Sequence, residues 1–185
     1  MAEGAQRRAT VVFRLMDDRA VVERQLGRSP RAFRRVVARC PFGLPAVTEQ
    51  EPYDANGRPF PTTFYVTCPH LVSAIARLEA AGGVERWSRE VGEDGELAES
   101  LARATDEQRA IRRELAGTDQ RSDDGASLEL GIGGSRSPAH LKCLHAHVAF
   151  ALARPGYVLG ELILAEVQPP WPTERCCSER FRDDD

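Results

Sequence analysis

Three cysteines of this chain stand beside residues that suit a metal centre. Cys40 and Cys68 are each followed by proline, and Cys143 lies in a Lys-Cys-Leu-His-Ala-His segment that ends at His147. Thiolates and imidazoles are the ligands of zinc sites, and thiolates also hold iron–sulfur clusters. We therefore expect the three cysteines to converge on a zinc ion or a [4Fe–4S] cluster, with His147 as a fourth ligand and His145, His70 and His140 as alternative ligands or supporting residues.

The number of protein ligands decides what such a centre does. A fourth ligand from the protein would close the zinc coordination and make the site structural, whereas three would leave a position open for water or substrate. A cluster held by three thiolates would likewise leave one iron free to bind substrate. The long spacings between the cysteines match no short zinc-finger or ferredoxin pattern, so this site would form only in the folded chain.

Cys68 also fits a second chemistry, thiol catalysis without a metal. It precedes Pro69, which suits the first turn of a helix. The backbone N–H groups at a helix N-terminus stabilise a thiolate and lower the pKa of a cysteine there. Cys68 would then be the nucleophile, with His145 or His147 as the base and His70 as a further candidate base.

Two arginines are candidates for holding an anionic substrate. They are Arg58 and Arg136, and the second follows the glycine-rich turn at residues 131–134. Such a turn before a helix can hold a phosphate or carboxylate on its backbone N–H groups. The glycine spacing matches neither the dinucleotide fingerprint nor the P-loop, so a plain connection into the next helix is the favoured interpretation.

The histidines are predicted to lie on a helix over residues 138–154. At about 100° per residue, Cys143 and His147 share one face, and His140 lies on the same side. His145 falls instead on an apolar stripe, where it would pack in the core or orient a ligand by a hydrogen bond. The alternative is that these histidines are ordinary core or surface residues.

Sequence patterns predict three strands in a small sheet. They are Val36–Cys40, Ala46–Gln50 and Thr62–Thr67, and the last is rich in β-branched and aromatic residues. The Asn56-Gly57 pair is a strong turn signal between the second and third strands. We therefore expect at least two of the strands to pair in antiparallel fashion.

Apolar periodicity predicts four or five helices packed against this mostly antiparallel sheet, in a single α+β domain. The expected helical segments are residues 17–27, 69–83, 84–117 (one helix, or two broken near Gly92–Gly95), 138–154, and 157–167, the last being a helix or a strand. The segment 84–117 is strongly charged. It suits a third function, a non-enzymatic module that binds a partner protein.

The domain is expected to span residues 10–168, with a polar linker at about 117–126. Residues 1–9 and 169–185 are expected to be disordered. The vicinal pair Cys176 and Cys177 falls in that tail, and we therefore leave it out of the predicted site.

Overall composition disfavours two kinds of partner. The net charge of −3 argues against a nucleic-acid binder, which would carry an excess of basic residues. No segment approaches the roughly 20 apolar residues of a membrane span, and the N-terminus does not resemble a signal peptide. We expect a cytoplasmic protein, whose five cysteines stay reduced, with a small molecule or a protein as its partner and an undetermined oligomeric state.

Four motifs, in this order, resemble a known family. They are Cys40-Pro-Phe-Gly-Leu-Pro, Phe60-Pro-Thr-Thr-Phe-Tyr-Val-Thr-Cys-Pro-His-Leu-Val, Gly131-Ile-Gly-Gly and Lys142-Cys-Leu-His-Ala-His. Together they resemble the bacterial domain of unknown function 501 family, from about Val21 to Val167. The resemblance implies a bacterial protein and brings no established activity with it.

Overall fold

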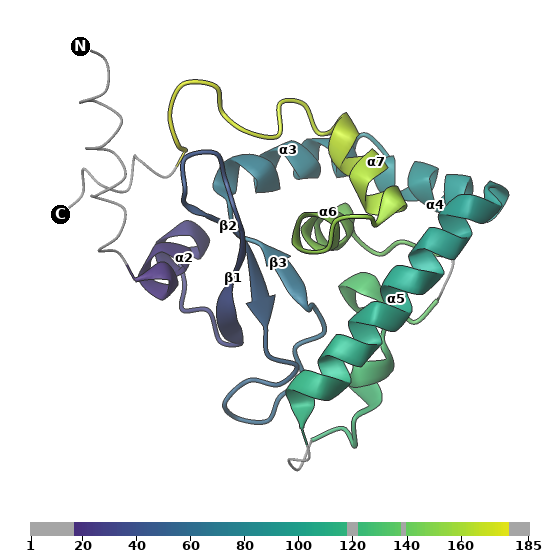
Figure 1. Cartoon of the computed structure of the whole chain (residues 1–185), viewed down its shortest axis with the longest axis horizontal. Coiled ribbons are helices and arrows are strands. Elements are labelled where there is room, and N and C mark those ends of the chain that lie inside the picture. The colour runs from purple at the N-terminus through teal and green to yellow at the C-terminus, as the bar shows by residue number, and fades with distance from the viewer. Residues whose placement is uncertain (1–16, 118–121, 138–139, 178–185) are drawn as a thin grey trace.

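The computed structural model describes residues 17–117, 122–137 and 140–177. Within them the chain forms six α-helices and one three-stranded antiparallel sheet, which confirms the α+β class and exceeds the expected four or five helices. Helix α2 lies on one side of the sheet and α6 on the other (Figure 1). The predictions for residues 1–9, for the middle of the linker and for the end of the tail fall outside the described residues.

The sheet has the order β1-β2-β3, with strands Phe33–Arg39, Pro45–Gln50 and Phe64–Val66. The central strand β2 is buried along its whole length and pairs in antiparallel fashion with both neighbours, as the turn signals predicted. A tight turn joins β1 to β2, in which the backbone N–H of Cys40 donates to the Leu44 carbonyl at 2.9 Å. Cys40 therefore sits at the turn of a hairpin.

Local signals set the ends of the first two described helices. Helix α2 (Asp18–Leu26) follows the N-cap residue Asp17, whose side chain accepts a backbone N–H, and ends at Gly27 with φ 65°. Helix α3 (Pro69–Ala80) begins with proline directly after Cys68. The predicted place of Cys68 at a helix N-terminus is confirmed.

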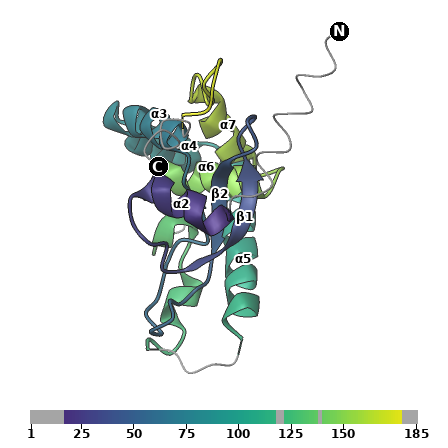
Figure 2. The same ribbon diagram turned by 90° about the vertical axis from the view of Figure 1, so that its left-hand side faces the viewer.

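The charged stretch at residues 84–117 forms two helices, α4 (Gly83–Glu93) and α5 (Gly95–Ala116). They separate at Asp94, which has an extended backbone and whose carboxylate accepts the N–H groups of Glu96 and Leu97. The break lies inside the predicted window. Helix α5 runs past the sheet toward the loops at the far end of the molecule (Figure 2).

Helices α6 (Leu144–Ala153) and α7 (Val158–Glu166) complete the core. Helix α6 contacts α3, α7 and β3, and most of its residues are buried, which explains why it is apolar on nearly every side. For residues 157–167, the helix alternative is correct and the strand alternative is wrong. No single helix of the described residues is long and apolar enough to cross a bilayer, although α6 and α7, bent by 114°, meet those criteria as a pair.

The described segment after α7 also contributes to the core. Cys176 is buried, Trp171 packs against the core, and the Pro169 carbonyl lies 2.9 Å from His70 Nε2. Residues 169–177, expected to lie outside the domain, therefore pack against it.

Candidate metal centre

The structure does not support the predicted three-cysteine centre. Cys40 is buried in the β1–β2 turn, Cys68 is the N-cap residue of α3, and Cys143 directly precedes α6. Within the described residues, the group of His, Cys, Asp or Glu side chains whose ligand atoms lie within 4.8 Å of one another consists of Glu79, Cys143 and His145. The predicted ligand Cys143 and the alternative ligand His145 thus belong to the candidate site, and Glu79 joins them.

Cys68 lies in an environment that keeps its thiol protonated. Its Sγ is 3.7 Å from Sγ of Cys177, a residue left out of the predicted site. The hydrogen bond with Cys177 and burial raise the pKa of the Cys68 thiol, which corrects the expectation that a helix N-terminus would lower it. Cys68 is therefore a poor nucleophile in this fold.

Of the two histidines of α6, the structure places the alternative ligand His145, and not His147, beside Cys143. His147 is only 1% exposed, its Nδ1 is 2.7 Å from the Tyr157 hydroxyl, and burial lowers its pKa to about 3, so the ring is neutral. The helical wheel placed Cys143 and His147 on one face because it assumed a helix from residue 138. Cys143 instead has an extended backbone, φ −166° and ψ 129°, and α6 begins at Leu144.

His145 is the histidine that faces Cys143. Its Nδ1 is 3.1 Å from Glu79 Oε1, and its Nε2 is 3.2 Å from the Val72 carbonyl oxygen. Since both partners accept hydrogen bonds, both ring nitrogens donate and the ring is an imidazolium. Burial alone would lower the pKa of His145, but the hydrogen bond with Cys143 and the negative charge of Glu79 outweigh it and raise the pKa to about 9.

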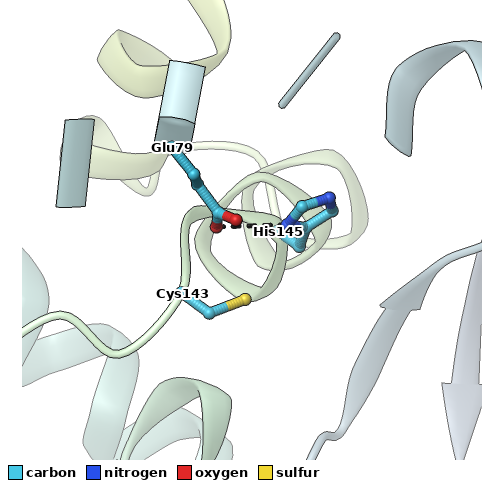
Figure 3. Close-up of side chains that lie close together, drawn as sticks. All are labelled: Glu79, Cys143 and His145. Atoms are coloured by element: carbon cyan, nitrogen blue, oxygen red, sulfur yellow. Dashed lines mark hydrogen bonds and ion pairs between the residues drawn. The ribbon is translucent and has the colours of Figure 1, made fainter. Parts of the chain in front are cut away.

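Glu79 joins α3 to the start of α6. Its Oε1 accepts the Leu144 backbone N–H at 2.6 Å as well as the His145 ring N–H, so it caps α6 from a different helix. Figure 3 shows the Glu79 carboxylate beside the His145 ring, with the Cys143 sulfur pointing toward the same space. No local pattern links Glu79 to Cys143, because only the contact between α3 and α6 brings them together.

A largely apolar cavity of about 280 Å³ adjoins this group, and Cys143 and His145 form part of its wall. The rest of the wall consists of Thr62, Phe64, Tyr65, Val66, Val72, Gly133 and Ala146. The site therefore has a protected space next to a thiol and an imidazole, which is where a small ligand would be held.

The remaining predicted residues lie elsewhere. His70 contacts the Pro169 carbonyl, and His140 is exposed beside the Ser135–Ser137 segment. Arg58 and Arg136 are both exposed, and neither lines the cavity of the candidate centre. Their suggested role in holding an anionic substrate stays a prediction.

Comparison with known proteins places the chain in a family. No curated protein and no solved structure matches it. The family described as "Protein of unknown function (DUF501)" matches residues 36–165, a range that includes Glu79, Cys143, His145 and most of the cavity-forming elements. Because this match covers well over half of the chain, the protein belongs to the DUF501 family.

Proposed function

We propose that this protein binds a zinc ion through Glu79, Cys143 and His145. The observation that carries the proposal is the convergence of a carboxylate, a thiol and an imidazole within 4.8 Å where α3 meets α6. Zinc binds these three ligand types in tetrahedral geometry, in which neighbouring ligand atoms are roughly 3.3–3.8 Å apart. Small side-chain movements would reach that geometry.

The surroundings of His145 support its role as a ligand. Metal-binding histidines commonly donate their second ring N–H to a carbonyl or carboxylate, which fixes the ring orientation. Nε2 does so with the Val72 carbonyl, which leaves Nδ1 to bind the ion in place of its proton. The Leu144 N–H holds Glu79 in a similar way, through Oε1.

The ligand set favours zinc over an iron–sulfur cluster. A [4Fe–4S] cluster is held mainly by thiolates, and this group contains one. Three protein ligands leave a fourth position, and two of the three residues line the cavity. The proposed site is therefore open, and the zinc would activate a water molecule or polarise a small ligand held there.

Metal analysis of variants tests the proposal. Purified without an affinity tag of histidines, the wild-type protein should contain one zinc per chain. Cys143→Ala and His145→Ala should each weaken zinc binding by more than about 100-fold, because even changes to residues around metal ligands cost about 10–100-fold. Cys40→Ala is the matched control and should bind normally. Loss of zinc from folded Cys40→Ala, but not from Cys143→Ala, would contradict the assignment.

A second candidate function is metal-free thiol catalysis by Cys143. It is favoured by the place of His145, held by the Glu79 carboxylate, beside Cys143 at the cavity wall, because an imidazolium next to a cysteine stabilises the nucleophilic thiolate. Limited alkylation of metal-free protein with iodoacetamide, followed by peptide mass spectrometry, should then label Cys143 before Cys177. Preferential labelling of Cys177 would contradict this second function.

A further inference from the structure

A buried nitrogen of His147 has no hydrogen-bond partner among the residues that the structure describes. The Tyr157 phenol is also buried, and its partner within the described residues is His147 Nδ1. If the phenol donates to Nδ1, the ring proton of neutral His147 is on Nε2. Within the described residues that Nε2 has no partner, although a buried donor normally has one. The described part of the chain therefore offers this nitrogen no acceptor.

His147 lines a small cavity of about 20 Å³, which has room for one water molecule or one ligand oxygen. Since Nδ1 is turned to Tyr157, the edge of the ring that carries Nε2 is left for this cavity. The other lining residues come from α5, among them Thr105 and Arg109, and from the segment that leads into α6, among them Ser135, Arg136, Ser137 and His140.

A wider surface pocket of about 460 Å³ adjoins the small cavity, because Ser135, Arg136, Ser137 and His140 line both. Arg136 and Lys142 bring positive charge to it, and neither forms an ion pair with the described residues. No acidic residue is among the described side chains that line either pocket. The combined site thus offers cations and donors, with no carboxylate to oppose an anion.

We propose that these adjoining pockets bind the phosphate group of a small molecule, with one phosphate oxygen accepting the N–H of His147 Nε2. Arg136 and Lys142 balance the phosphate charge, since charge-assisted hydrogen bonds from such side chains are the strong ones. A single water molecule would satisfy His147 but would leave the unopposed cations unexplained. The site does not depend on the zinc proposal, because it uses none of the three proposed ligands.

Titration with inorganic phosphate and with glycerol 3-phosphate tests the site. Both are added at constant ionic strength to protein freed of metal by a chelator, so that phosphate cannot bind zinc. Calorimetry should give saturable binding, and NMR should show the ring Nε2–H signal of His147 moving with the same affinity. Tighter binding of the ester would indicate that its organic part occupies the wider pocket, and equal binding would indicate free phosphate as the ligand.

Two exposed arginines provide matched variants. Arg136→Gln should weaken phosphate binding by about tenfold or more, the effect of losing one charge-assisted hydrogen bond. Arg58→Gln removes the same charge from a residue outside both pockets and should bind like the wild type. Absence of saturable binding, equal losses in the two variants, or a His147 signal that does not move would overturn the proposal and leave a water-filled cavity.

Discussion

At the scale of single residues, the environment of each cysteine and histidine decides its chemistry. Cys68 has the expected helix N-terminus, but its contact with Cys177 and its burial raise its pKa. His147 is buried in the core, whereas His145 has a quarter of its side chain exposed and lies beside Glu79 and Cys143. The sequence singled out Cys143 and His145 but not Glu79, and only the contacts in space bring these three side chains together.

The raised pKa of His145 predicts a pH dependence of stability in the metal-free protein. The folded-state pKa of about 9 exceeds the unfolded value, so the ion pair with Glu79 stabilises the fold fully below about pH 6.5. This contribution, on the order of 1–3 kcal/mol, is lost as the pH rises through about 9. Urea unfolding at about pH 6.5 and above about pH 9 would measure the free energy of unfolding of the wild type and of His145→Gln. The difference between the two proteins should narrow as the pH rises. A difference in the free energy of unfolding that does not change with pH would contradict the assignment of a positive charge to His145.

The zinc affinity of the protein should rise with pH, whereas the stability of the metal-free protein should fall. Below about pH 9 the ion must displace a proton from His145, so the apparent affinity should rise with pH up to that value. Competition titrations with a chelator of known affinity would measure it. An affinity that is independent of pH between about 6 and 9 would show that His145 is not a ligand.

At the scale of elements, close packing between α6 and α7 explains the glycine at position 160, inside α7. A Cβ at Gly160 would lie 2.8 Å from the His147 carbonyl oxygen and 2.5 Å from the Tyr157 ring. Because the carbonyl belongs to the backbone of α6, the helices would have to separate.

Gly160→Ala should therefore destabilise the protein by about 1–3 kcal/mol, although alanine is the better helix former. Gly92→Ala in α4 is the matched control, since nothing lies within 4 Å of its added Cβ. It should be neutral or stabilise by up to about 1 kcal/mol. Thermal unfolding of both variants would measure the effects, and equal stabilities would contradict the packing described here.

The sequence predicted the helix ends well where residues next to those ends determine them. Caps and helix-initiating residues such as Asp17 and Pro69 lie where the helices begin, and the break before α5 falls inside the predicted window. The start of α6 was missed because the group that caps it, Glu79, belongs to α3. That one error put Cys143 on a helix and paired it with His147 in place of His145, so a tertiary contact decided the site.

At the scale of the whole molecule, a buried arginine ties the long helix α5 to the loops around it. Arg112 is completely buried and donates to the carbonyls of Phe60, at 2.9 Å, and Ser127, at 3.2 Å. These acceptors belong to the loop between β2 and β3 and to the segment after α5. Helix α5 is therefore joined to two loops by one side chain.

Arg112→Ala should destabilise the protein by about 3 kcal/mol or more, because it leaves a cavity and removes the donor from the Ser127 carbonyl, in a buried contact, and from the Phe60 carbonyl, in a partly buried one. Its neighbour Arg113 pairs with Glu129 on the surface, and Arg113→Ala should cost no more than about 1 kcal/mol. Chemical unfolding would measure the free energy of unfolding of both variants. A small effect of Arg112→Ala would mean that the loops do not depend on this contact.

The most direct test of the zinc centre is X-ray absorption spectroscopy of the zinc-loaded protein at the zinc edge. The Glu79, Cys143 and His145 site predicts one sulfur at about 2.3 Å and two or three nitrogen or oxygen ligands at about 2.0–2.1 Å. Cys143→Ala, if it retains any zinc, should lose the sulfur contribution. Three sulfur ligands in the wild type, or the same sulfur contribution in Cys143→Ala, would contradict this account.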